Sequence, residues 1–504
     1  MRRRAQLAPD DAGRRGRPLL TARLFQNPVI GGGDRVDHGD PMVVKYLDTF
    51  YLYHSGETAG RKGITVYASR DLVTWDHRGV ALEPSATGWP HTDVWAPEVL
   101  YDKGTFYMYV AAARERASGV PAGHRMRQLG VARSHDPLGP FVWDPEPLVK
   151  EDWSIDGHPF RDDDGTLWMF YNRRINDAWF REGRGGTGNV VDRLFGHDRL
   201  AGEPTIVAYP SQAWEYAPDG NWAWNEGAWV VKRRGRYYQM YSGGHFENLS
   251  YAVGVSYADD LRGPWLKIPD NPILTSSGRI TGVGHHSLVL GPDTATAYAV
   301  YHGYLGDVAA GRKVHLDRFH WRGDRPLISG PTAAPQPHPP QPVHDPDVPH
   351  AKTEAWVHGA EVAVHGVRFA LDPPDVIHQL EIRHSRGLFA LRVGGVLRHV
   401  GPPLGGSAIA GDVLHETTTS HVDDEQWYVL PAGCVLEWPW GGGGEVEIVA
   451  AARGRLTLRA GTEERRIDSP TFELVTFRAE AVDRLAIEAH ESGSVVTDVQ
   501  LFAR

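Results

Sequence analysis

The sequence predicts an all-β protein in which a five-bladed β-propeller is followed by a C-terminal β-sandwich. Three observations support this fold class. An aromatic strand pattern recurs five times between residues 40 and 322, almost no stretch has a helical period, and the sequence texture changes after a proline-rich stretch. At 504 residues the chain is too long for one ordinary core, so two or three domains are expected.

Each repeat is marked by a short aromatic strand. The five markers start at residues 50, 106, 167, 237 and 297. Most follow a turn that contains glycine, such as Asp163-Asp164-Gly165, and most precede a second alternating strand and a tryptophan. Four strands in each of five repeats predict a propeller over residues 25–330, because radial closure leaves only short, protected sheet edges. A series of β-sandwiches is the competing interpretation.

The remaining segments differ in composition. Residues 1–24 are arginine-rich and aperiodic, which predicts a flexible N-terminal segment. Residues 331–350 are rich in proline and predict an extended, fairly stiff linker. Residues 351–504 contain about nine short alternating strands separated by glycine turns, which predicts the sandwich.

Composition excludes several classes of protein. The net charge of -10 provides no basic field that would bind nucleic acid. The sequence contains no run of about 18 apolar residues, so no membrane span is expected. Cys434 is the single cysteine, so an internal disulfide and a cysteine-based zinc cluster are excluded. The basic start from Met1 to Arg4 is followed by no apolar segment, so a cytoplasmic location is expected. The oligomeric state is not determined by the sequence.

Three carboxylates precede aromatic markers by similar distances: Asp40 by 10 residues, and Asp156 and Glu226 by 11. An aspartate beside proline or glycine is usually a turn residue, but one register in three repeats would place these side chains at one end of the channel. Tryptophans at positions 222, 224 and 229 flank Glu226. Burial among indoles would raise its pKa, which suits a general acid near neutral pH.

With these residues in place, the sequence resembles glycoside hydrolase family 43 over roughly residues 26–322. The matching motifs occur in order along the chain: Asn27-Pro28-Val29-Ile30 with Asp40-Pro41, Trp95-Ala96-Pro97-Glu98-Val99, Ile155-Asp156, Asn225-Glu226-Gly227 and Gly284-His285-His286-Ser287. The stretch from Gly31 to Gly39 is longer and more polar than the family's usual approach to Asp40, so the rim of the first subsite is expected to differ.

The resemblance implies a five-bladed propeller and an inverting hydrolase. It implies that Asp40 is the general base, that Glu226 is the general acid, and that Asp156 orients the acid and raises its pKa. Inversion needs a base and an acid about 6.5–9.5 Å apart, so that a water molecule fits between base and sugar. A third carboxylate disfavours ionisation of the acid.

Substrate contacts are predicted for aromatic and polar residues near these motifs. An indole can stack on a sugar ring, although each aromatic residue has a core position as its alternative. Arg312 would hydrogen-bond the terminal sugar or lie on a solvated hairpin. The predicted aromatic and imidazole contacts are Trp95, Phe160, Trp224 and His54.

The resemblance also implies a histidine near the axis, close to a bound cation or water. Adjacent strand residues point opposite ways, so only one of His285 and His286 can face the axis, and His285 is favoured. A calcium ion there would need water for most of its shell. No cofactor is required for the expected chemistry, and a structural calcium at His285 is left open.

The expected function is exo-acting, inverting release of terminal arabinose or xylose from oligosaccharides, as in an α-L-arabinofuranosidase or β-xylosidase. One alternative is a propeller glycosidase for another sugar, such as galactose. A second alternative is a non-catalytic carbohydrate-binding protein, although binding alone needs no three aligned carboxylates. The C-terminal domain is expected to bind sugar, to shape the active-site rim or to stabilise the propeller.

Overall fold

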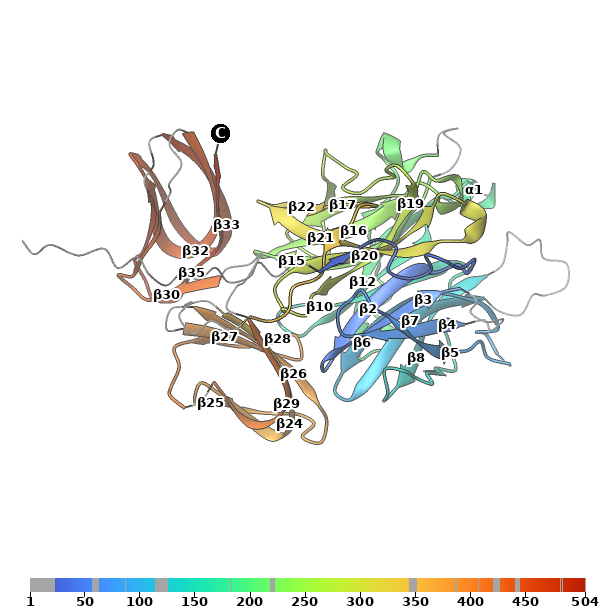
Figure 1. Cartoon of the computed structure of the whole chain (residues 1–504), viewed down its shortest axis with the longest axis horizontal. Helices are drawn as coiled ribbons and strands as arrows, with labels where there is room; N and C mark the ends of the chain where they lie inside the picture. Colours follow the sequence, from blue (N-terminus) through green and yellow to red (C-terminus); the bar gives the residue numbers. More distant parts are fainter. Residues whose placement is uncertain are drawn as a thin grey trace, which may run out of the picture.

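The structure is a computed structural model, and it is nearly all-β (Figure 1). The expected N-terminal segment up to residue 22 and residues 344–350 of the expected linker lie outside the described part of the chain. The few helical turns are α1 (Asp177–Arg181), η2 (Ala213–Glu215), η3 (Phe246–Asn248) and η4 (Val308–Ala310). The described residues are 23–56, 63–86, 88–113, 126–182, 184–217, 223–343, 351–385, 388–406, 408–419, 427–439, 445–480, 482 and 484–503.

Five antiparallel sheets follow one another along the first part of the chain, and each pairs its strands in sequence order. The five aromatic markers all form the second strand of a sheet. The long spacing between the third and fourth markers accommodates α1, η2 and an additional strand, β14 (Thr205–Ala208). The sheets are β2 (Gly39–Tyr46), β3 (Thr49–Ser55), β4 (Ile64–Ser69) and β5 (Asp76–Leu82); β6 (Thr92–Asp102), β7 (Thr105–Ala113), β8 (Arg127–Ser134) and β9 (Val142–Trp143); β10 (Ser154–Arg161), β11 (Leu167–Arg174), β12 (Thr187–Phe195) and β13 (Arg199–Leu200); β15 (Asn225–Arg233), β16 (Arg236–Gly243), β17 (Ala252–Ala258) and β18 (Leu266–Lys267); and β19 (Ile280–Leu290), β20 (Ala297–Leu305), β21 (Lys313–Arg322) and β22 (Arg325–Ile328).

The first strands of the five sheets contact one another in a closed order, β2–β6–β10–β15–β19 and back to β2. Apolar side chains fill the spaces between neighbouring sheets; Met42, Tyr53, Val99 and Phe106, for example, share one cluster between the first two. The arrangement is of the β-propeller type. The segment before β2 closes the ring, because Val29 N–H donates to the carbonyl of Val314 on β21 at 2.8 Å.

Each first strand contains a β-bulge near the same end. The bulge places one residue in the left-handed region, where non-glycine residues are uncommon. These residues are Asp40 (φ 54°), Ala96 (51°), Asp156 (55°), Gly227 (59°) and His285 (47°). Asp40, Asp156 and His285 therefore occupy equivalent positions. Glu226 lies one residue earlier, so the prediction of one register for all three carboxylates is wrong by one residue.

The N–H groups at four of these bulges donate across to the preceding sheet. Ala96 N–H donates to Ser55 Oγ at 2.7 Å, and His285 N–H donates to Ser242 Oγ at 2.8 Å. Asp40 N–H donates to His302 Nδ1 at 3.1 Å, and this bond joins the last sheet to the first. In each pair the acceptor lies five residues after the start of its aromatic marker. The fourth bond, from Gly227 N–H to Asp156 Oδ2 at 2.9 Å, uses a carboxylate.

The C-terminal part consists of two six-stranded sheets. The first has its own buried cluster, which includes Ala355, Leu380 and Phe389, and the second has another. Figure 1 shows the two sheets curling separately. A single sandwich is therefore not confirmed. The strands are β24 (Ala351–Val364), β25 (Val367–Ala370), β26 (His378–Ser385), β27 (Leu388–Val393), β28 (Val396–Gly401) and β29 (Ile409–Thr419); then β30 (Trp427–Leu430), β31 (Val435–Pro439), β32 (Glu445–Ala460), β33 (Glu463–Glu480), β34 (Arg484–Ala489) and β35 (Ser494–Ala503). A short pair, β1 (Leu24–Phe25) and β23 (Gln336–Pro337), precedes them.

The first C-terminal sheet packs on the ring at the end opposite the bulges. Lys45, at the far end of β2, pairs with Glu354 at 2.5 Å. Tyr101, at the far end of β6, donates its hydroxyl to the carbonyl of Ile377 at 2.7 Å. Both contacts lie several residues beyond the bulge on their strand, so this sheet supports the ring from behind.

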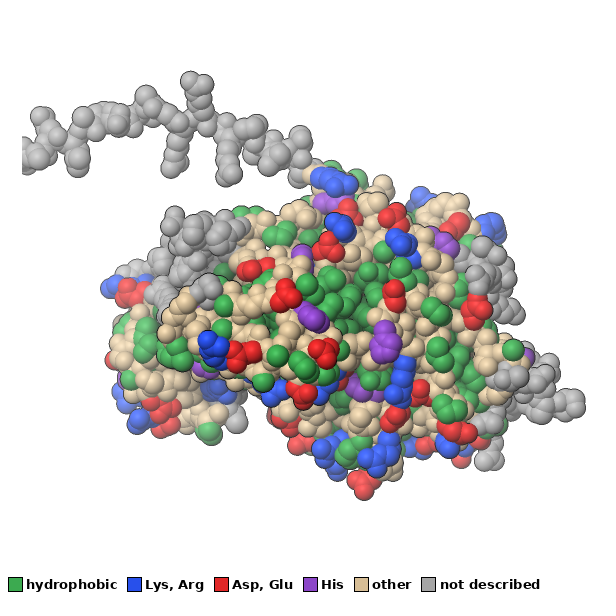
Figure 2. Space-filling model, turned by 90° about the horizontal axis from the view of Figure 1, so that it is seen from below, with side chains coloured by type: hydrophobic (Ala, Val, Ile, Leu, Met, Phe, Trp, Pro, Cys, Tyr) green, Lys and Arg blue, Asp and Glu red, His purple; other side chains and the backbone are tan. Residues whose placement is uncertain are grey.

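No helix in the described ranges has the length and apolarity needed to cross a membrane. Figure 2 shows the face seen from below, where the described acidic and basic side chains are interspersed.

We predict that Ser55→Ala destabilises the ring. The variant leaves the buried Ala96 N–H without its acceptor, which costs about 1–3 kcal/mol. Equilibrium unfolding in urea measures the loss. The exposed Ser329 serves as the matched control, because Ser329→Ala should change the free energy of unfolding by less than about 0.5 kcal/mol. Equal stability of the Ser55 variant and the native protein would show that the bond across the sheets contributes little.

Candidate active site

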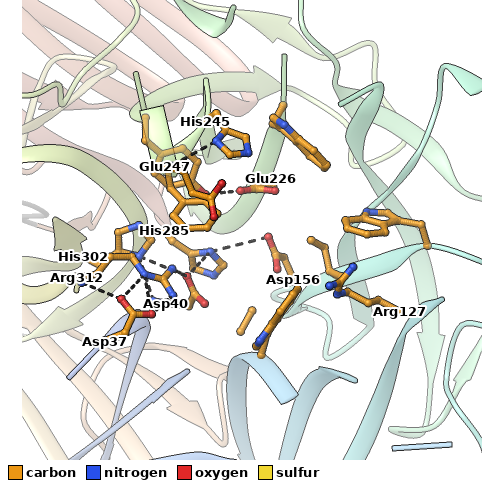
Figure 3. A pocket seen from close by; sticks show the side chains of 17 residues that line it. Asp37, Asp40, Arg127, Asp156, Glu226, His245, Glu247, His285, His302 and Arg312 are labelled. Carbon is orange, nitrogen blue, oxygen red and sulfur yellow. Dashed lines mark hydrogen bonds and ion pairs between the residues drawn. The ribbon is translucent and has the colours of Figure 1, made fainter. Parts of the chain in front are cut away.

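A cavity of about 490 Å³ lies where the bulged ends of the five first strands converge (Figure 3). All five sheets contribute to its wall, and the structure brings Asp40, Asp156 and Glu226 together there. Of the other residues proposed from the sequence, Trp95, Trp224, His285 and Arg312 also line it. The remaining lining residues are Asp37, Ala96, Arg127, Trp153, Ile155, His245, Phe246, Glu247, Tyr251 and His302.

Asp40 is held as a carboxylate. Arg312 Nη1 donates to its Oδ1 at 2.9 Å, and His285 Nδ1 lies 3.4 Å from the same oxygen. Burial alone would raise the pKa of Asp40, but the charges of Arg312 and His285 hold it well below its ordinary value. The side chain is therefore ionised at neutral pH and able to accept a proton.

Glu226 has the opposite tendency. Burial raises the pKa of its carboxyl to about 7, and the negative charge of Asp40 adds to the rise. The hydroxyl of Tyr251 donates to Glu226 Oε1 at 2.7 Å, which lowers the pKa and partly offsets the effect of burial. Near neutral pH a substantial fraction of this carboxyl is protonated, as a general acid requires.

Asp156 shares the cavity with these two groups. Burial raises the pKa of Asp156 well above its ordinary value, and the charges of Glu226 and Asp40 raise it further. Its Oδ2 accepts the Gly227 N–H, next in sequence to Glu226, and lies 3.9 Å from His285 Nδ1. Asp156 thus fixes the backbone that carries Glu226.

Two neighbours hold the ring of Tyr251 in place. Its ring stacks on His302 with an interplanar angle of 2° and centroids 5.5 Å apart. Gly284 also lies against this ring, because an added Cβ there would lie 2.4 Å from Tyr251 Cδ1. The glycine before His285 is therefore required by the tyrosine, and the stacked ring directs the hydroxyl toward Glu226.

Arg312 is clamped by two carboxylates. Asp37 accepts from Nε at 3.0 Å and from Nη2 at 2.6 Å, while Asp40 accepts from Nη1. The guanidinium also lies over the ring of Phe246, 4.9 Å from its centroid. Asp37 comes from the long polar stretch before Asp40, so the departure noted in the sequence supplies part of the cavity wall.

The ring face of Trp95, which was proposed to stack on a sugar, is covered by Arg127. The guanidinium of Arg127 lies 4.1 Å from the centre of the Trp95 ring, and its Nη2 pairs with Asp93 at 3.1 Å. Trp224, by contrast, lines the cavity with a buried Nε1 that has no hydrogen-bond partner in the described ranges. Trp224 therefore remains a candidate contact, whereas the ring face of Trp95 is covered.

Two predicted substrate contacts are corrected. Phe160 is buried between the third and fourth sheets with Phe170 and Tyr237, away from the cavity, because it lies beyond the bulge of β10. His54 is fully buried and does not line the cavity; its Nε2 contacts His38 Nδ1 at 3.2 Å. His286 is buried as well, whereas His285 lines the cavity, in agreement with the alternation argument.

The side chains around His285 indicate whether a cation would fit there. His285 Nδ1 is directed at Asp40 and Asp156, and in the described ranges no group of three His, Cys, Asp or Glu side chains is arranged to hold a metal ion. These residues do not form a protein shell of the kind that calcium prefers. No step of the chemistry is therefore assigned to a metal.

Sequence reasoning missed several lining residues. His302 could have been found, because it lies five residues after its marker, as Ser55 and Ser242 do. Tyr251 and Arg127 carry no comparable signal; each lies in or beside a third strand, and only the ring places it beside the carboxyls. His245, Phe246 and Glu247 lie on the short segment around η3, which no pattern predicted.

Comparisons with known proteins agree with this geometry. The family model described as glycosyl hydrolases family 43 matches residues 25–326. A β-D-galactofuranosidase of Aspergillus niger is 26% identical over 58% of this chain and 82% of its own. An extracellular exo-α-(1→5)-L-arabinofuranosidase of Cellvibrio japonicus is 25% identical over 61% of this chain and 90% of its own.

A solved structure is also similar. The crystal structure of a thermostable family-43 glycoside hydrolase is 33% identical, has a TM-score of 0.56, and covers 63% of this chain and 99% of its own. The matched family model includes the first strand of each of the five sheets and every lining residue of the cavity. The chain therefore belongs to glycoside hydrolase family 43 and is a glycosidase.

Proposed function

We propose that the enzyme is an exo-acting, inverting hydrolase that releases terminal arabinose or xylose from oligosaccharides. The observation that carries this proposal is the pairing, in one cavity, of a carboxylate with a depressed pKa and a carboxyl with a pKa of about 7. Five sheets surround the cavity, so it is a pit that favours a chain end over the middle of a polymer. We take the five sheets (residues 25–330) as the blades of a five-bladed propeller and residues 351–504 as an accessory region.

In the proposed mechanism Asp40 is the general base. It takes a proton from a water molecule as the water attacks the anomeric carbon on the face opposite the leaving group. The charge of Arg312 keeps Asp40 ionised before the reaction. The hydrogen bonds to Asp37 fix the guanidinium of Arg312, so that it stays beside Asp40 when substrate binds.

Glu226 is the proposed general acid, which protonates the leaving oxygen. Because Tyr251 donates to Oε1, the transferable proton of Glu226 is held on Oε2. Asp156 is the proposed positioning group, which fixes the adjacent backbone through Gly227 N–H, and when it is ionised its charge favours the protonated form of Glu226. Two carboxyls suffice for this chemistry, so hydrolysis should need no cofactor.

Several groups are suited to recognise the sugar. Trp224 Nε1, His285 and Arg312 would contact the terminal residue's hydroxyls, and Trp95 would contact it at an edge because Arg127 covers its face. The exo-arabinofuranosidase relative supports arabinose as the released sugar. The second candidate is a galactofuranoside, which the Aspergillus niger relative favours.

We predict that Asp40→Asn and Glu226→Gln each reduce kcat on an oligosaccharide by about 10²–10⁴, the usual contribution of general acid–base catalysis. The two variants should differ on aryl glycosides. A good leaving group needs little protonation, so it should restore much of the activity of Glu226→Gln and none of that of Asp40→Asn. Circular dichroism serves as the control for folding. Full activity of Glu226→Gln on a poor leaving group would contradict the assignment.

We predict that activity is constant from mildly acidic pH up to near 7 and is then lost as Glu226 ionises. Asp40, with its depressed pKa, should limit the rate only in strongly acidic solution. Tyr251→Phe removes a hydrogen bond that stabilises the ionised acid, so the alkaline limb of kcat/KM should move to higher pH by about one unit. The stacking on His302 is retained in phenylalanine. A merely structural tyrosine would lower the rate without moving this limb.

Substrate class is tested with a panel of nitrophenyl glycosides. We expect hydrolysis of the α-L-arabinofuranoside or β-D-xyloside, with the first product formed in the inverted anomeric configuration by NMR. Preference for the β-D-galactofuranoside would favour the second candidate. Binding without hydrolysis across the panel would favour a carbohydrate-binding protein.

A further inference from the structure

One wall of the active-site cavity consists of an arginine and two indoles from the second and third sheets. Arg127, at the start of β8, and Trp95, on β6, belong to the second sheet, and Trp153 directly precedes β10 of the third. The guanidinium of Arg127 lies 4.1 Å from the centre of the Trp95 ring and 5.3 Å from that of Trp153. The side chain of Arg127 lines the cavity and is 13% exposed, so a ligand in the cavity can reach it.

Arg127 is held in place through contacts with both sheets. Its Nη2 pairs with Asp93 Oδ2 at 3.1 Å. Its backbone N–H donates to the carbonyl of Asp152 at 3.2 Å, which joins the second sheet to the segment before the third. The indole of Trp153 is itself fixed, because its Nε1 donates to Asn172 Oδ1 at 3.1 Å. The guanidinium is therefore a fixed part of the cavity wall.

Asp93 occupies a backbone position that suits glycine. β6 and β19 each have a second register shift, earlier on the strand than the bulge at Ala96 or His285. In β19 the residue in the left-handed region there is Gly282 (φ 59°), whereas in β6 it is Asp93 (φ 52°). Glycine adopts this conformation more readily than aspartate, but it would lack the carboxylate that holds Arg127. A less favourable residue kept beside a cavity is typical of functional sites.

The position of Arg127 relative to the proposed base indicates which part of the substrate it meets. Asp40 and Arg312 lie at the junction of the fifth and first sheets, whereas Arg127 lies at the junction of the second and third. Figure 3 shows Asp40 and Arg127 on opposite sides of the view. In an inverting reaction water attacks from the side of the base, and the leaving group departs on the opposite face. With Asp40 as the base, the leaving group faces Arg127.

We propose that Arg127 determines specificity for the leaving group, because its guanidinium donates hydrogen bonds to hydroxyls of the sugar that follows the scissile bond. A guanidinium carries N–H donors in a fixed planar arrangement, which suits this recognition. It also covers the face of Trp95, on which an aromatic leaving group would otherwise stack. The preferred substrate class is therefore a glycoside whose leaving unit is a sugar. This role rests on the proposed function, since it needs Asp40 to be the base.

Arg127→Ala tests this role through KM for two leaving groups on the glycosyl unit that the native enzyme hydrolyses best. The variant loses the donors and uncovers Trp95, so KM for the oligosaccharide should rise at least about tenfold, while KM for the nitrophenyl glycoside should fall. Arg127→Met keeps an apolar cover over the ring, so it should change only the oligosaccharide KM. Arg466→Ala, at a side chain that is 81% exposed, is the matched control and should behave as the native enzyme does.

Partial unfolding would not reproduce this result, because inactive protein lowers the apparent kcat and leaves KM unchanged. Equal changes of KM for both leaving groups, or no change for the oligosaccharide, would overturn the role of Arg127 while the proposed function stands. Absence of hydrolysis by the native protein across the nitrophenyl panel would instead overturn the proposed function, and this role with it.

Asp93→Asn gives a second test that leaves the backbone of the wall in place. Asparagine tolerates the left-handed conformation as aspartate does, but it lacks the charge that holds Arg127. KM for the oligosaccharide should rise several-fold, with a thermal midpoint within about two degrees of the native value. Combined with Arg127→Ala, Asp93→Asn should add no further increase, because both residues act through one guanidinium. An additive increase, or an unchanged KM in the single variant, would show that the pair does not recognise the leaving sugar.

Discussion

The structure depends on one repeated constraint, the β-bulge near the cavity end of each first strand. A bulge releases a backbone N–H from its own sheet, and such a group must find another acceptor if it is buried. At four of the five bulges the preceding sheet provides it, through Ser55, Ser242, His302 or Asp156. The same bond that ties one sheet to the next therefore sets the orientation of the residue that faces the cavity. Ring assembly and active-site geometry are consequences of the same interaction.

The electrostatics of the site follow from unequal placement of counter-charge. All three carboxyls are buried, which by itself raises their pKa values. Asp40 has an arginine against it, whereas Glu226 accepts a hydrogen bond from a neutral tyrosine. The arginine in turn is anchored by Asp37, outside the reacting pair. The charge of Arg312 is therefore the main reason why the proposed base is ionised at a pH at which the proposed acid is still partly protonated.

Much of this arrangement could be predicted from the sequence, because a repeat carries its own register. Each of the five aromatic markers identified one strand, the second, in its sheet. The motifs around Asp40, Asp156 and Glu226 identified the cavity. Phe160 was misplaced because a pattern of strands does not reveal how far from the bulge a side chain lies. Tyr251 and Arg127 were missed because their position depends on packing between sheets. The separate cores of the two C-terminal sheets depend on sheet curvature, which strand patterns leave undetermined.

The position of the C-terminal part has a practical consequence. Its first sheet contacts the ring through Lys45 and Tyr101, at the end opposite the cavity, and all the described residues that line the active site precede residue 313. Attachment of the enzyme to a solid support through its C-terminal sheets would therefore leave the mouth of the pit facing the solution. Immobilised in that orientation, the catalyst would meet oligosaccharide ends as freely as it does when dissolved.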